Sequence, residues 1–181
     1  MVGRLSKEDW LQAGLTQLAR LGPDGLKLAH LCKVQGRTTG AFYAHFTDHA
    51  GFVKDLIAHW EKTYTDDVMA ASGAKADQLA SIVRRLDHRI EVAMRLYGFQ
   101  NPVVAAKLAE VDEKRIGFLA WLYGKSGALE ATEARAFAEL EYAAFVGTQM
   151  VWQGEPIERS IAVSATFDRL VAAHLEKGED R

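Results

Sequence analysis

Apolar residues recur at intervals of three or four along nearly the whole chain, which is the spacing of amphipathic helices. The clearest stripe advances in steps of four through Phe52, Leu56, Trp60 and Tyr64. The apolar–polar alternation that is typical of strands is almost absent, and the sequence contains only three prolines. The pattern therefore predicts an all-α protein of nine helices.

Residues that begin or end helices divide this pattern into elements. Ser6 with Asp9 three positions later resembles a capping box, and Asn101-Pro102 is a helix-start signal. The turn residues at 22–25 end the first helix. We expect one helix from about residue 75 to 98, and two helices that bend around Asp112 between 101 and 124. The last two helices are expected over about 132–152 and 155–175.

The composition is that of an ordinary globular protein, with 49% hydrophobic and 25% charged residues. The single Cys32 cannot form an internal disulfide, and neither a long apolar run nor a leader pattern is present. We therefore expect a cytoplasmic protein without membrane contact. The net charge of −2 is uneven, because residues 1–60 hold seven Lys/Arg and five Asp/Glu while the rest is acidic. This asymmetry favours a small DNA-facing head on an acidic body.

Residues 25–46 meet the requirements of a helix-turn-helix. Gly36 can supply a tight turn between two short amphipathic helices, and Leu31 and Phe42 can pack these helices together. The outer side of the second helix is small and polar enough to enter a major groove. The outward-facing candidates are Arg37, Thr38, Thr39 and Tyr43.

The run from Gly40 to Phe46, Gly-Ala-Phe-Tyr-Ala-His-Phe, resembles the signature of TetR-family transcription regulators. The resemblance covers residues 6–64, with His59-Trp60 similar to a pair in some members, and extends more weakly to Val111–Arg115. It implies a nine-helix TetR-like fold with a helix-turn-helix DNA-binding domain over residues 1–48. Residues 49–181 would form a helical ligand-binding and dimerisation domain. The implied function is a ligand-responsive repressor that binds palindromic operator DNA as a homodimer and is released by a small molecule.

The resemblance also implies roles for single residues. Thr38 and Thr39 open the recognition helix, where family members contact phosphates and base edges, and Gly40 lets the backbone approach the DNA closely. Tyr43 and His45 match a pair that binds phosphate oxygens. Such contacts set the register on the duplex, whereas groove contacts read its sequence.

Two positions, Arg37 and His49, depart from the family pattern. Arg37 replaces a Val that normally seals the turn, and it is a candidate contact to phosphate or guanine because a guanidinium suits both. His49 stands where the family has Lys or Arg, and an unperturbed imidazole is mostly uncharged near neutral pH. Phe42 and Phe46 are expected in the core rather than at the DNA. The DNA-binding candidates are therefore Arg37, Thr38, Thr39, Gly40, Tyr43, His45 and His49.

The remaining helices would hold the dimer interface and the ligand pocket. The helix expected over 132–152 is apolar or small over much of its surface, which indicates burial on several sides. The candidate interface residues are Phe137, Leu140, Ala144, Gly147, Met150, Ile161 and Leu170. The effector is unknown. The candidate pocket residues, mostly aromatic, are Trp60, Tyr64, His88, Met94, Tyr97, Phe118, Trp121 and Tyr142.

Alternative functions remain open from the sequence. An activator or a ligand-independent regulator would have the same fold. An all-α enzyme is disfavoured because no Ser-His-Asp arrangement, phosphate loop or close carboxylate pair is evident, so we expect neither catalysis nor a cofactor. A metal site is not expected, since His88 has no second ligand at helical spacing. A helical adaptor that only dimerises would leave Thr38, Thr39 and Tyr43 without a role.

Overall fold

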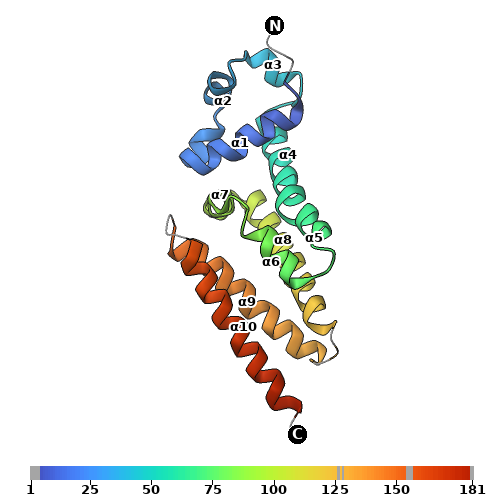
Figure 1. Cartoon of the computed structure of the whole chain (residues 1–181). Coiled ribbons are helices and arrows are strands. Elements are labelled where there is room, and N and C mark those ends of the chain that lie inside the picture. The colour runs from blue at the N-terminus through green and yellow to red at the C-terminus, as the bar shows by residue number, and fades with distance from the viewer. Residues whose placement is uncertain (1–4, 126, 128, 154–156, 180–181) are drawn as a thin grey trace. The chain divides into compact units, whose positions relative to one another are not determined.

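The computed structural model describes residues 5–125, 127, 129–153 and 157–179, and every regular element within them is helical (Figure 1). The all-α prediction is confirmed. A π-helical turn joins α4 to α5, so the α-helices of the described residues form nine continuous runs. None of these described helices combines the length and apolar character needed to cross a bilayer. The elements are α1 (Lys7–Leu21), the 3₁₀ helix η1 (Gly22–Leu26), α2 (Leu28–Gln35), α3 (Thr39–Tyr43), α4 (His49–Glu61), the π turn η2 (Lys62–Asp66), α5 (Asp67–Ala71), α6 (Ala76–Val83), α7 (His88–Gly98), α8 (Pro102–Gly124), α9 (Ala131–Val151) and α10 (Ile157–Glu179).

The chain divides into two compact units, and each is made of two separate segments. The first unit holds residues 1–67 and 87–109, and the second holds residues 68–86 and 110–181. The predicted boundary between residues 48 and 49 separates expected functions, whereas these units follow contacts within the chain. That functional boundary therefore stays a prediction.

The first unit begins with the predicted capping box. The Ser6 hydroxyl accepts a hydrogen bond from the Asp9 amide at 3.1 Å, and the Asp9 carboxylate accepts one from the Ser6 amide at 2.7 Å. After α1, the predicted turn residues form η1. Gly25 lies so close to α1 that a Cβ there would collide with the carbonyl of Gln17. Glycine at this position therefore lets η1 pack directly against α1.

Helix α7 completes the first unit. It packs against α1 and η1, and its residues Ile90 and Met94 are buried. The buried Glu91 carboxylate accepts hydrogen bonds from Trp60 Nε1 of α4 at 3.2 Å and from Arg95 at 3.3 Å. A buried carboxylate is costly without such partners; the Trp60 bond ties α4 to α7, whereas the Arg95 bond lies within α7.

The second unit is built on α9 and α10, which lie side by side (Figure 1). Phe137 of α9 contacts Tyr123 of α8 and both Phe167 and His174 of α10, with ring centroids between 5.1 and 6.5 Å apart. Phe137 therefore joins three helices of its own unit.

A hydrogen-bonded group joins α8 to α9 in the same unit. The Tyr142 hydroxyl donates to Asp112 Oδ1 at 2.6 Å and accepts from Arg115 Nη1 at 3.1 Å. Asp112 and Arg115 belong to the segment Val111–Arg115 that carries the weaker part of the family resemblance. In this structure the two side chains fasten α8 to α9.

Two helix predictions are wrong. Residues 75–98 form α6 and α7 rather than one helix, because the Asp87 side chain accepts from the Arg89 amide at 3.1 Å and caps a new helix. Helix α8 is continuous through Asp112. The Asp112 side chain points to Tyr142 and does not interrupt the backbone.

Candidate nucleic-acid interface

The turn between α2 and α3 is formed by Gly36, as predicted. Its φ and ψ are 60° and 41°, a left-handed conformation that favours glycine because a side chain is strained there. The Gly36 amide donates to the Lys33 carbonyl at 3.3 Å and the Arg37 amide to the Cys32 carbonyl at 2.9 Å. The end of α2 is thus satisfied and the chain turns directly into α3.

The contact between α2 and α3 is apolar. Leu31 and Phe42 are both 0% exposed, which confirms their predicted place in the core. The Phe42 ring lies 5.5 Å from Trp10, 4.8 Å from Phe46 and 5.2 Å from Phe52, centroid to centroid. Phe42 and Phe46 therefore hold α3 against α1 and α4 and are not available to DNA.

Two polar contacts that the sequence gave no reason to expect tie α2 to α1. His30 Nε2 and Gln17 Oε1 are 2.9 Å apart, and Gln17 is 3% exposed. Gln35 Nε2 donates to the Asp9 carbonyl at 3.1 Å. These bonds join residues 13 and 26 positions apart in the chain, and no local pattern could reveal them.

The outer side of α3 carries hydroxyl groups and a phenol. The Thr38 hydroxyl caps the helix, accepting from the Ala41 amide at 3.4 Å. Thr38 and Thr39 are exposed, and Tyr43 is 52% exposed although its ring edge contacts Phe42. A short helix with a buried aromatic side and an exposed hydrogen-bonding side is the form needed for insertion into a groove.

Gly40 lies on this exposed side of α3. A Cβ built there would meet only the Thr38 hydroxyl oxygen, at 3.7 Å, which is an ordinary contact. The fold therefore does not require glycine at this position. What glycine provides is a bare stretch of backbone beside Thr39 and Tyr43.

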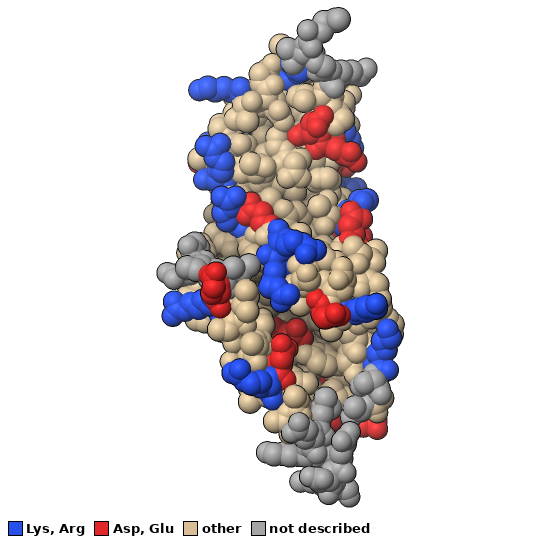
Figure 2. Space-filling view, viewed as in Figure 1, with Lys and Arg blue, Asp and Glu red and all other residues tan. Residues whose placement is uncertain are grey.

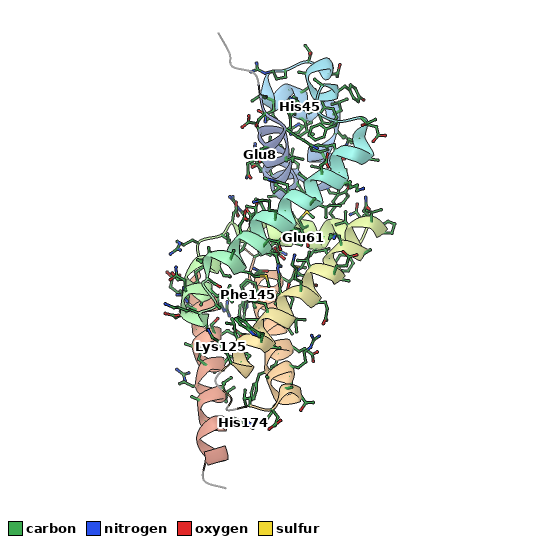
Figure 3. The ribbon with its side chains drawn as sticks, turned by 90° about the vertical axis from the view of Figure 1, so that its right-hand side faces the viewer. Glu8, His45, Glu61, Lys125, Phe145 and His174 are labelled. Atoms are coloured by element: carbon green, nitrogen blue, oxygen red, sulfur yellow. The ribbon has the colours of Figure 1, made fainter. Side chains whose placement is uncertain are left out.

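Arg37 and His45 flank the helix and are both half-buried. Arg37 Nη1 lies 3.5 Å from the Gly36 carbonyl oxygen. The His45 ring, labelled in Figure 3, is tilted by 58° against the Phe46 ring, with centroids 6.3 Å apart. Six of the seven DNA-binding candidates thus lie in one short segment, residues 37–45.

His49, the seventh candidate, has a partner within the protein. It is the first residue of α4, and its Nε2 lies 2.9 Å from the Leu26 carbonyl oxygen at the end of η1. A ring nitrogen beside a carbonyl must donate, so Nε2 carries the hydrogen. This bond fastens the start of α4 to the segment that leads into α2. The predicted phosphate contact from His49 remains a prediction.

The charges of the first three helices are mixed. Lys27 pairs with Asp24 at 2.8 Å, and this ammonium lowers the pKa of the Asp24 carboxyl. Lys7 pairs with Asp55 at 2.7 Å. On the face drawn in Figure 2, Lys and Arg side chains are interspersed with Asp and Glu. Any DNA contact would thus depend on a few well-placed groups more than on a broad positive field.

The eight pocket candidates divide between the two units. Trp60, Tyr64, His88, Met94 and Tyr97 belong to the first unit, and Phe118, Trp121 and Tyr142 belong to the second. Trp60 and Met94 are 0% exposed and serve as core. Burial raises the pKa of the Tyr64 phenol and lowers the pKa of His88, with the carboxylates of Asp87 and Glu91 close to both. A single pocket lined by all eight residues stays a prediction.

The dimer-interface candidates also differ in environment. Leu140, Ile161 and Leu170 are 58%, 40% and 64% exposed. Ala144, Gly147 and Met150 are half-buried. Phe137 is engaged within its own unit, as described above.

Comparisons with known proteins add no family assignment. Neither the protein-family models nor the curated proteins include a match to this chain.

Within the described residues, no group of three or more His, Cys, Asp or Glu is placed to hold a metal ion. Cys32 is buried, and burial raises the pKa of its thiol.

Proposed function

We propose that this chain is a TetR-type transcription regulator, a homodimeric repressor that binds palindromic operator DNA and is released by a small molecule. The observation that carries the proposal is the two-sided character of α3. Phe42 is completely buried, whereas Thr38, Thr39 and Tyr43, which follow Gly36 in the chain, are exposed to solvent. Surface helices in general have a polar outer side, but here that side directly follows the left-handed Gly36 turn and includes the bare backbone of Gly40, an arrangement that suits a recognition helix.

In the proposed complex α3 enters the major groove. The Tyr43 hydroxyl and the His45 imidazole bond to phosphate oxygens and set the register. Thr39 and Arg37 face base edges, where a guanidinium can make a bidentate contact to guanine. Gly40 lets the backbone come close enough for these side chains to reach.

Helix α4 is the proposed route from effector to DNA. It is anchored at its start by the bond from His49 to the Leu26 carbonyl and near its end by the bond from Trp60 to Glu91. A displacement of α4 would therefore act on the segment that precedes α2. Moving a population almost completely from one state to the other requires a differential affinity of roughly 5.5 kcal/mol.

Dimerisation is proposed through α9 and α10. Leu140, Ile161 and Leu170 offer exposed apolar side chains on these helices. Scattered exposed apolar residues are common, but three large ones on two neighbouring helices favour an interface. Two reading heads are also what a palindrome demands, since its half-sites lie about one helical turn apart.

The test begins with selection of bound duplexes from a random DNA pool, followed by titration of the selected sequence at several salt concentrations. Tyr43→Ala should reduce affinity at least tenfold while far-ultraviolet circular dichroism stays unchanged. Phe99→Ala is the matched control, because Phe99 is an aromatic residue that is 83% exposed and lies outside residues 1–48, the predicted DNA-binding domain. Failure to enrich any sequence at moderate salt would refute the proposal.

The alternatives separate in the same experiments. A ligand-independent regulator or an activator would also enrich a sequence, and a reporter gene placed behind that sequence would then distinguish repression from activation. An adaptor or enzyme would show no difference between Tyr43→Ala and Phe99→Ala. The slope of log affinity against log salt gives the number of phosphates engaged, about 0.9 per phosphate on duplex DNA.

A further inference from the structure

A surface depression of about 400 Å³ lies where α8 ends and α9 begins, within the second unit. Its volume is within the range of small-molecule sites, roughly 300–1,000 Å³. Its described walls come from α8, α9 and Lys125, which directly follows α8. The described lining residues are Ala120, Trp121, Gly124, Lys125, Ala131 and Ala134.

The lining favours a flat, apolar ligand. Four of these six residues are alanine or glycine, and such small residues form a flat floor that leaves room for a ligand. One of them, Ala134, is only 2% exposed. Trp121 is 52% exposed, and its indole stacks on Phe118 with centroids 5.7 Å apart and an interplanar angle of 28°. Phe118 thereby holds the indole in place, and Trp121 stays about half exposed as one of the residues that line the depression. A preorganised aromatic surface of this kind stacks well on another planar ring.

The lining also favours a negative charge. Lys125 is the only charged residue among the six described lining residues, and its Nζ lies 5.5 Å from the centre of the Trp121 ring. The same ammonium donates one hydrogen bond, to the Ala74 carbonyl at 3.2 Å. An ammonium has three donors, so this bond orients the group and leaves donors for a ligand.

We infer that this depression binds a planar aromatic carboxylate of one or two fused rings. The ring stacks on Trp121 over the alanine and glycine floor, and the carboxylate bonds to Lys125 Nζ. The inference rests on the proposed function only in identifying such an anion as the effector; binding itself is independent of DNA.

The experiment compares 2-naphthoate with 2-naphthamide, which has the same rings and no charge, by isothermal titration calorimetry on the full chain without DNA. We expect naphthoate to bind up to about fivefold more tightly, because a hydrogen bond between two charged groups is stronger than one to a neutral amide, although solvent weakens it at the exposed Lys125. Lys125→Met should remove that preference and leave naphthamide binding unchanged, and Lys125→Arg should retain the preference. Equal affinity of the two probes for the unmodified chain, or absence of binding, would overturn the inference.

A pair of alanine substitutions locates the site. Ala131→Leu fills the depression and should abolish binding of both probes. Ala136→Leu, at an exposed position on the same helix outside the depression, should leave both unchanged. Binding that survives Ala131→Leu would place the ligand elsewhere and refute the assignment. If naphthoate binds and no DNA sequence is enriched, the proposed function is refuted and the ligand site is supported. If a DNA sequence is enriched and naphthoate does not bind, the ligand site is refuted and the proposed function is supported.

Discussion

Gly40→Ala separates the requirements of the fold from those of DNA binding. The new methyl group would meet only the Thr38 hydroxyl oxygen, at 3.7 Å, so nothing in the protein needs to shift. Glycine in a helix is less favourable than alanine by roughly 0.5–1 kcal/mol because it loses more backbone freedom on folding. The variant should therefore be as stable as the unmodified chain or more stable by up to about 1 kcal/mol.

The same methyl group would stand on the exposed side of α3, between Thr39 and Tyr43 in the proposed interface. Inserting a methyl group into a packed contact costs about 1–3 kcal/mol. Since 1.4 kcal/mol corresponds to a factor of ten, the affinity for DNA should fall by about 5- to 150-fold. Stability and DNA affinity should thus change in opposite directions.

Urea unfolding and fluorescence anisotropy with a selected duplex measure the two quantities on the same preparation. Gly117→Ala is the matched control, because Gly117 is an exposed residue inside α8 and a Cβ there would meet nothing within 4 Å. That variant should gain similar stability and keep full affinity. If Gly40→Ala retains full affinity, the α3 backbone does not approach DNA closely and the proposed docking is wrong.

Three further substitutions test contacts inside the two units. His49→Ala should lower the free energy of unfolding by about 1 kcal/mol through loss of the bond to the Leu26 carbonyl, and urea unfolding without any change would exclude that bond in solution. Tyr142→Phe should cost about 1–2 kcal/mol, because the buried hydroxyl bonds to Asp112 as well as to an arginine, and an unaltered urea midpoint would contradict this. Burial lowers the pKa of His88 in the folded chain below its value in the unfolded chain. As the pH falls, the imidazole is therefore protonated first in the unfolded chain, so the free energy of unfolding is unaffected by His88 above about pH 6.5 and decreases below it. His88→Gln should therefore flatten the decline in stability between about pH 7 and 5, and an equally steep decline would refute it.

Local signals in the sequence predict much of the head. The capping box at Ser6, the turn at Gly36 and a short helix beginning near Thr38 each follow from residue types a few positions apart, and all three are present in the structure. The aromatic core around Phe42 follows from helical spacing. These features depend on short-range chemistry, which a sequence displays directly.

Other features depend on partners that are distant in the chain. The apolar positions of α6 continue into α7 with nearly helical spacing, so this spacing predicts one helix. It gives no sign that Asp87 starts a second helix. Helix α8 runs through Asp112 without the predicted bend, and the carboxylate bonds instead to Tyr142, 30 positions later. The hydrogen bond from His49 to the Leu26 carbonyl joins residues 23 positions apart, and the phosphate contact predicted for His49 stays a prediction. No local pattern contains the information that brings these pairs together.

The discontinuity of the first unit has a consequence for the order of synthesis. The side of α1 that α7 covers stays uncovered until residues 87–109 have left the ribosome. At roughly 5–20 residues per second, the ribosome takes about 2–8 s to add residues 68–109. During those seconds the segment that holds α1, α2 and α3 has its local turns and caps, but α7 does not yet cover α1. Residues 1–67 therefore complete their core only together with residues 87–109, and a gene fragment that ends at residue 67 would encode an unfinished core.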